Sequence, residues 1–177
     1  MLSRQHAFTL IELLVVIVII GSMLSLAVFS MGSAGGTREL HNEADRLAAV
    51  IALQLEEATL DNREYGLQLS KDSYRVLAYD EPRAEWAPLA GQQTHHLPDW
   101  MQLNLKLEGT ALQLPEASVT DDPSAKHAPV PQLLLLSSGE LSPFSLQLRD
   151  SRPTGQSYAL SSDGFSLPQT RMEQAGK

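Results

Sequence analysis

Hydrophobic and polar positions divide the chain into three stretches with different periods. The first is a nearly continuous apolar run that begins at Phe8 and ends at Phe29. Such a run is typical of a helix that is apolar on all sides. At a rise of about 1.5 Å per residue, about 22 residues are enough to cross a hydrocarbon core of roughly 30 Å. The pattern therefore predicts a transmembrane helix over residues 8–29.

The second stretch predicts an amphipathic helix. It follows a junction of small residues at 31–36, and the sequence predicts one long helix from about Phe8 to about Asp61, with a bend allowed at the glycines of the junction. Helical spacing puts on one face Leu40, Ala44, Leu47, Ala48, Ile51, Leu55 and Ala58, and on the other Glu39, Glu43, Arg46, Gln54 and Glu57. The apolar face is expected to pack on a sheet.

Beyond Tyr65 the hydrophobic period changes to two, which indicates half-buried strands. The predicted strands cover residues 67–69, 74–79, 101–107, 110–114, 132–136, 144–148, 158–160 and 165–167, with 132–136 as the candidate central strand. Turns are expected at 70–72, 108–109 and 163–164. Two long loops are expected at 80–98, where Trp86 is the anchor, and at 115–131.

These elements predict an α+β fold, in which a long N-terminal helix packs on a mostly antiparallel, two-layer β body of about seven or eight strands. The predicted organisation is a leader (1–7), a transmembrane helix (8–29), a junction with an amphipathic spine helix (30–62), a β-rich body (63–167) and a flexible tail (168–177).

Glu12 is the one charged residue in the apolar run. Inserting an acidic side chain into hydrocarbon costs roughly 2.5–3.5 kcal/mol of free energy. Its presence there therefore suggests that Glu12 has a function. If a peptidase cuts after Ala7, Phe8 carries a new α-amino group, and Glu12 lies four residues further on the same helix face. The Glu12 carboxylate can then neutralise the Phe8 amine of a neighbouring, staggered copy. This pairing would set the register of an assembly.

Two other interpretations of the N-terminus explain less of its sequence. A secretory signal peptide would be cut after Ser25-Leu26-Ala27, but its apolar region has about 7–15 residues and rarely carries a glutamate. An ordinary signal anchor explains the length of the run but leaves Glu12 unexplained.

Charge predicts the topology. Arg4 precedes the apolar run, and the chain has a formal net charge of −8 and a pI near 5.0. The positive-inside rule places the leader in the cytoplasm and the body outside, in the periplasm of a Gram-negative cell. The chain has no cysteine, which excludes disulfides, thiolate zinc sites and thiol catalysis.

The sequence predicts no enzyme, no cofactor and no metal. The histidines lack metal-ligand spacing, and adjacent His95 and His96 would point to opposite faces of a strand. Residues 137–139, Ser-Ser-Gly, lack the context of a nucleophile elbow, and a turn is expected there. The pair Asp121 and Asp122 is interpreted as a solvated acidic tip rather than a calcium site. Basic residues are scattered and outnumbered, which disfavours nucleic acid.

The sequence from Phe8 to Val16, FTLIELLVV, resembles the class III signal of type IV pilins and pseudopilins. In that family a prepilin peptidase removes the leader and methylates the new N-terminal Phe. The resemblance implies cleavage after Ala7, N-methylation of Phe8 and an assembly role for Glu12. One departure is Ala7, since the family usually has Gly there; alanine is also small enough for a tight peptidase subsite.

Motifs in the body resemble the protein H family of minor pseudopilins of the type II secretion system. They are Gly66-Leu67, Trp86-Ala87-Pro88-Leu89, Leu97-Pro98 and the segment SSGELSPF at 137–144. The resemblance implies a structural subunit at or near the tip of a pseudopilus that drives export of folded proteins across the outer membrane. Implied partners are the minor pseudopilins I, J and K, the major pseudopilin G, the prepilin peptidase and the inner membrane, and further candidates are exported substrates and the outer-membrane secretin.

Two alternatives of other classes stay open at this stage. One is a minor pilin of a type IV pilus, with a role in assembly priming, adhesion or DNA uptake; the acidic body lacks the basic C-terminal segment of the DNA-binding members. The other is a signal-anchored periplasmic enzyme, which the lack of an enzyme motif in the sequence disfavours.

Overall fold

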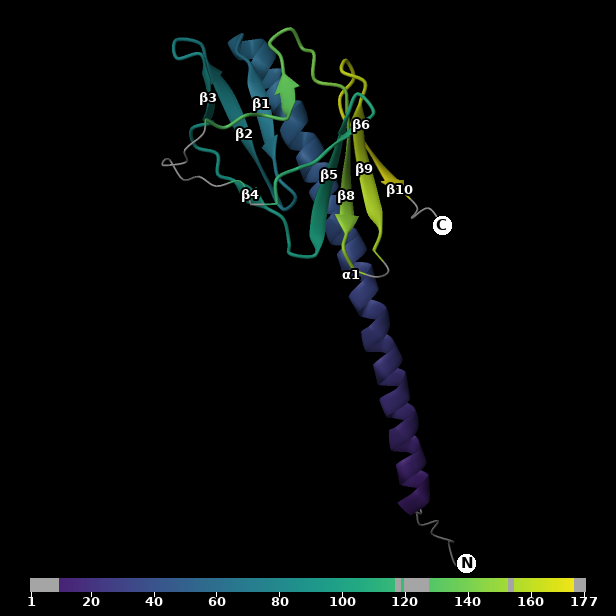
Figure 1. The fold of residues 1–177 in the computed structure, drawn as a ribbon. Helices are drawn as coiled ribbons and strands as arrows, with labels where there is room; N and C mark the ends of the chain where they lie inside the picture. The colour runs from purple at the N-terminus through teal and green to yellow at the C-terminus, as the bar shows by residue number, and fades with distance from the viewer. Residues whose placement is uncertain (1–9, 117–118, 120–127, 153–154, 174–177) are drawn as a thin grey trace, which may run out of the picture. The chain divides into compact units, whose positions relative to one another are not determined.

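The computed structural model describes residues 10–116, 119, 128–152 and 155–173, and for residues 26–34 it describes the backbone alone. The chain divides into two compact units, Met1–Glu39 and Leu40–Lys177 (Figure 1). Helix α1 (Leu10–Asp61) contributes to both units. Its end at Asp61 confirms the predicted end of the long helix, and residues 31–36 of the predicted junction have helical backbone.

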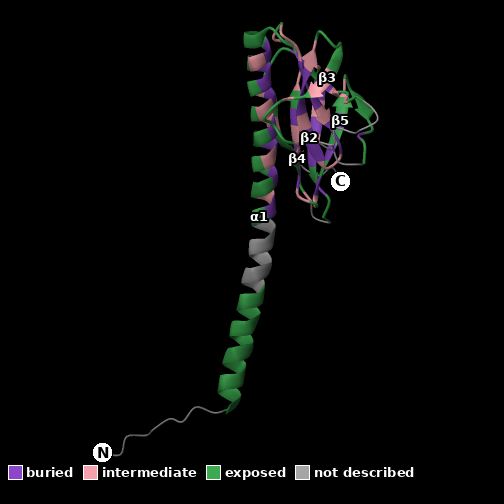
Figure 2. Cartoon of the chain, turned by 90° about the vertical axis from the view of Figure 1, so that its left-hand side faces the viewer, coloured by how far each residue is buried: buried purple, intermediate pink, exposed green. Residues whose placement is uncertain are grey.

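In the second unit, α1 buries one face against the β body, as Figure 2 shows by the buried stripe along the helix. The residues predicted on the apolar face are buried, except for the half-buried Ala48. Gln54 was predicted on the polar face, and this assignment is wrong because the residue is 0% exposed. Asn62 follows the helix with a positive φ of 49°, a left-handed conformation that suits asparagine after a helix end.

Two five-stranded sheets form the body, and each strand pair within them is antiparallel. The first sheet has the order β3-β2-β1-β7, with β4 also paired to β2; its strands are β1 (Tyr65–Leu69), β2 (Ser73–Asp80), β3 (Glu85–Pro88), β4 (His95–His96) and β7 (Leu133–Leu135). The second has the order β10-β9-β8-β5-β6; its strands are β5 (Met101–Leu107), β6 (Thr110–Leu112), β8 (Phe144–Asp150), β9 (Ser157–Ser162) and β10 (Gln169–Glu173).

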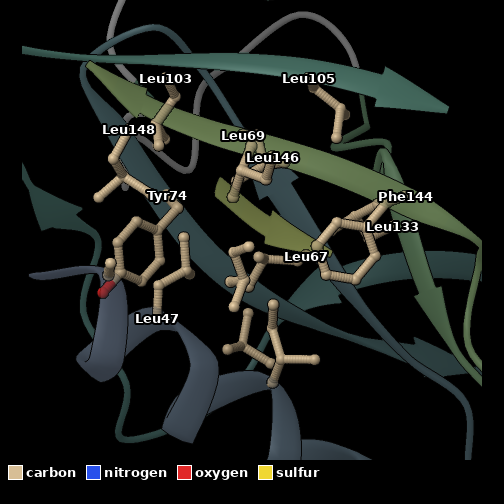
Figure 3. Close-up of a cluster of buried hydrophobic side chains, with 14 of the residues drawn as sticks. Leu47, Leu67, Leu69, Tyr74, Leu103, Leu105, Leu133, Phe144, Leu146 and Leu148 are labelled. Atoms are coloured by element: carbon tan, nitrogen blue, oxygen red, sulfur yellow. The ribbon is translucent and has the colours of Figure 1, made fainter. Parts of the chain in front are cut away.

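Leucines from both sheets and from α1 form one hydrophobic core (Figure 3). Leu47 of the helix, Leu67 of β1, Leu133 of β7 and Leu146 of β8 are all 0% exposed. Strand β5 shows the predicted alternation, with Met101, Leu103 and Leu105 buried and the residues between them exposed. The predicted α+β architecture, a helix packed on antiparallel sheets, is therefore confirmed.

Close packing also explains why Gly66 stands in the middle of β1. A Cβ atom at this position would lie 2.5 Å from Cβ of Pro131, the residue that leads into β7. Only a residue without a side chain lets the segment before β7 approach β1 so closely.

Several predicted strands need correction. Residues 165–167 form a loop and not a strand: backbone N–H groups of Phe165 and Ser166 donate to Oδ1 of Asp163, and the Phe165 side chain is 78% exposed. The predicted flexible tail contains β10 at Gln169–Glu173. Strand β7 lies at an edge of its sheet and is not central, and the predicted loop 80–98 contains β3 and β4.

An ion pair lies at the C-terminal end of β8. Asp150 and Arg152 form a bidentate ion pair whose shortest distance, from Nη2 to Oδ2, is 2.6 Å. The guanidinium lies over the ring of Trp100, 4.1 Å from its centroid. Hydrogen bonds from Arg152 hold the pKa of Asp150 below its usual range, against the opposing effect of partial burial.

Replacing Asp150 by asparagine is expected to lower the free energy of unfolding at pH 7 by about 1–2 kcal/mol, since a charge-assisted hydrogen-bond pair is lost. The pKa of Asp150 is depressed in the folded protein. Its contribution is therefore complete above the unfolded value of about 3.9 and disappears as the pH falls through the folded pKa. Urea unfolding of both proteins at several pH values tests this. A difference that stays constant below about pH 4 would contradict the assignment.

Candidate functional site

The N-terminal part of α1 carries the predicted assembly residue. Glu12 lies in the first turn of the helix, where the helix dipole favours a carboxylate. The processing residues Ala7 and Phe8 lie outside the described residues. The roles of these three residues therefore stay predictions.

Apolar side chains surround Glu12 on every side of the helix. The large ones between Leu10 and Leu24 are 47–84% exposed, so within this unit no packing covers them. The hydroxyls of Ser22 and Ser25 donate to the carbonyl oxygens of Val18 and Gly21, both at 2.8 Å. These bonds satisfy the only hydroxyl groups of the described stretch 10–25 within the helix itself, which suits surroundings without water.

Within the described residues, no helix is long and apolar enough to qualify as a membrane span. The predicted span 8–29 includes residues 8 and 9, which are not described, and 26–29, of which the backbone alone is described. The transmembrane helix over residues 8–29 therefore stays a prediction.

A second cluster of polar residues lies where α1 meets β2 and β4. Nε2 of His95 lies 2.6 Å from Oε1 of Glu43, and both side chains are largely buried. The Tyr74 ring packs against His95, with centroids 4.9 Å apart. Burial and then the Glu43 carboxylate raise the pKa of Tyr74, so its hydroxyl keeps its proton at physiological pH. Sequence reasoning did not predict this cluster, because its members lie far apart in the chain.

The remaining sequence candidates that the structure describes are structural residues. Trp86 is half-buried and contacts Tyr79 edge-on at 5.2 Å, while Phe144 is in the core. Residues 137–139 form the expected turn, in which Gly139 has a φ of 86°. Asp121 and Asp122 lie outside the described residues. Among the residues that are described, no group of three or more histidines and carboxylates is placed to hold a metal ion.

Two family models match the chain. Residues 2–28 match the prokaryotic N-terminal methylation motif, and residues 43–164 match the family described as type II transport protein GspH.

Curated relatives agree with these matches. The chain is 51% identical over 171 residues to type II secretion system protein H of Pseudomonas aeruginosa, covering 97% of this chain and 98% of the relative. It is 32% identical to the protein of the same name from Aeromonas hydrophila, over 82% of this chain and 81% of that protein.

Solved structures share the fold. The minor pseudopilin EpsH from the Type 2 Secretion System of Vibrio cholerae gives a TM-score of 0.56 at 20% identity, covering 78% of this chain and 99% of that one. The solution structure of E. coli GspH gives a TM-score of 0.55 at 20% identity, covering 76% of this chain and 88% of that one.

Proposed function

The chain belongs to the GspH family and is a minor pseudopilin of the type II secretion system, and we propose that it is a structural subunit at or near the tip of the periplasmic pseudopilus. There it would help to drive the export of folded proteins across the outer membrane. The match over residues 43–164, together with 51% identity to a protein H over nearly the whole chain, is the observation that carries this proposal.

Membership of the family implies assembly with other pseudopilins. We infer that the partners are the minor pseudopilins I, J and K and the major pseudopilin G, and that prepilin peptidase processes the chain. The motif at residues 2–28 supports a protein anchored in the inner membrane, with a periplasmic body. In this proposal the chain crosses the membrane once, its leader is cytoplasmic, and it carries out no catalysis.

The mechanism of assembly follows from the N-terminal helix. In the membrane the apolar side chains of residues 10–24 contact lipid, and in the filament they contact the helices of neighbouring subunits. Glu12 pairs with the Phe8 amine of a neighbour and fixes the axial register. Because an unpaired carboxylate in an apolar filament core is costly, subunits in a wrong register are disfavoured.

Processing by prepilin peptidase predicts a mature chain that begins at Phe8 and carries one extra methyl group. Intact mass measurement and N-terminal sequencing of the membrane-extracted native protein test this directly. A strain without the peptidase is the matched control, and there the chain should begin at Met1. A native chain that begins at Val28, or one that keeps Met1, would contradict the proposed pathway.

A further inference from the structure

A cavity opens beside α1, where the helix meets β2 and the segment between β3 and β4. Its volume is about 470 Å³, and its walls come from α1, from β2 and from residues 91–95. A cavity of this size holds far more than one ordered water and lies within the usual range of ligand pockets. Residues of the second unit alone line it, so its shape is a property of the periplasmic body.

Gln54 lines this cavity and carries an unsatisfied acceptor. Its side chain is fully buried, and its Nε2 donates to Oε2 of Glu57 at 2.9 Å. Because a carboxylate accepts and does not donate, this bond fixes the orientation of the amide and leaves Oε1 as the group without a partner. A buried acceptor in this state has lost the hydrogen bonds that it makes in water, so a donor is expected to reach it.

Tyr74 supplies the second unsatisfied group. The residue is 3% exposed, and its hydroxyl makes no well-aligned hydrogen bond, although Glu43 and Arg46 lie near it. Because the hydroxyl is protonated, it can donate to an oxygen that enters the cavity. The Gln54 Oε1 atom can therefore accept a hydrogen bond from a ligand, and the Tyr74 hydroxyl can donate one.

The charge of the residues that line the cavity indicates which acceptor group a ligand would carry. Arg46 and Arg75 line the cavity, and no acidic residue of the described part of the chain is in the lining, although Glu43 lies near Tyr74 and the whole chain has a net charge of −8. Arginine binds carboxylates and phosphates through paired hydrogen bonds, and of these two groups an unmodified peptide offers the carboxylate. Val50, Leu53 and Val76 supply an apolar wall, and Leu53 is 52% exposed. A ligand that fits this lining carries a carboxylate next to an N–H donor and an apolar group.

We propose that this cavity binds an acidic side chain carried on a peptide segment of a neighbouring pseudopilin subunit. The carboxylate contacts Arg46 and the Tyr74 hydroxyl, a main-chain N–H of the segment donates to Gln54 Oε1, and a flanking apolar side chain packs on Leu53. The choice of a pseudopilin as the source of the peptide rests on the proposed function. The chemistry of the site rests on the lining of the cavity alone.

Two matched peptides test the site, acetyl-Leu-Glu-Leu-amide and acetyl-Leu-Gln-Leu-amide, each titrated into the full chain in detergent micelles. Nuclear magnetic resonance follows the side-chain signals of Gln54 and Arg46. The glutamate peptide is expected to shift both signals and to bind at least about fivefold more tightly than the glutamine peptide, which corresponds to about 1 kcal/mol. Equal binding of the two peptides, or shifts that avoid these residues, would overturn the proposal.

Substitution of Arg46 separates a binding role from a structural one. Arg46→Gln should abolish the preference for the glutamate peptide without changing the unfolding midpoint, because the side chain is exposed. Arg149→Gln, at an exposed position of β8, removes the same charge elsewhere and should keep the preference. An unchanged preference in Arg46→Gln would overturn the site. Normal secretion by a strain that lacks the whole chain would instead overturn the proposed function and leave the peptide result valid.

Discussion

Replacing Glu12 by alanine should lower incorporation of the chain into pseudopili at least tenfold and reduce secretion of the system's substrates. In the proposed mechanism, the substitution removes the carboxylate that pairs with the Phe8 amine of a neighbour. Removing one partner of a buried ion pair leaves the other charge uncompensated, at a cost of about 3–5 kcal/mol. A cost of 1.4 kcal/mol already corresponds to a factor of ten in an equilibrium, so even a partly solvated pair meets the stated effect.

The experiment measures the chain in sheared pseudopili and in the membrane fraction by quantitative immunoblotting. Glu56→Ala is the matched control: it removes the same charge from an exposed position of the same helix, and incorporation should not change. Glu12→Gln keeps the shape and removes the charge, so it should behave like Glu12→Ala. N-terminal sequencing must show that each variant is processed like the parent protein, with Phe8 as the expected first residue. Normal incorporation of a correctly processed Glu12→Ala chain would contradict the register mechanism.

The long helix could be predicted because its signal is repeated over many turns, but Gln54 shows the limit of that signal. Gln54 lies seven residues after Leu47 and four before Ala58, so helical spacing alone places it in the middle of the buried face. Its polar side chain led to the opposite assignment. In its buried position its amide nitrogen donates a hydrogen bond to Glu57, and the residue lines the cavity beside α1. Position in the period was the better guide than residue polarity.

In the leucine-rich body, strands could be predicted where buried and exposed residues alternate, as in β5. Strands without this alternation were missed. Strand β10 has no buried residue, and β3 and β4 are at most half-buried, so no hydrophobic period marks them. Strand β10 is held by pairing with β9, and β3 and β4 are held by pairing with β2. The local sequence of a strand does not show which strand it pairs with. Residues 165–167 show the opposite error, a strand predicted where there is none. Phe165 and Leu167 have the spacing of a strand but are exposed in a loop. The cavity could not be predicted, because it joins residues of α1, β2 and the segment before β4.

Replacing Leu47 by alanine should destabilise the body by about 3–5 kcal/mol, within the range measured for large-to-small changes in well-packed cores. Leu47 is 0% exposed and belongs to the core that α1 shares with both sheets. The change removes buried apolar area and leaves a cavity that the surrounding strands cannot close, because they are fixed by their neighbours. Alanine and leucine have similar helix propensities, so the loss of packing accounts for the effect.

Urea unfolding of the full chain in a mild detergent, followed by tryptophan fluorescence, measures the change, because Trp86 and Trp100 both lie in the body. Leu60→Ala is the matched control, since the same substitution on the same helix removes a side chain that is 76% exposed. That variant should unfold within about 0.5 kcal/mol of the parent protein. Equal destabilisation by the two substitutions would mean that the helix contributes through its own stability, and the core assigned to its inner face would be wrong. A large effect confined to Leu47→Ala would identify the packing of α1 on the two sheets as the interaction that holds the periplasmic body together.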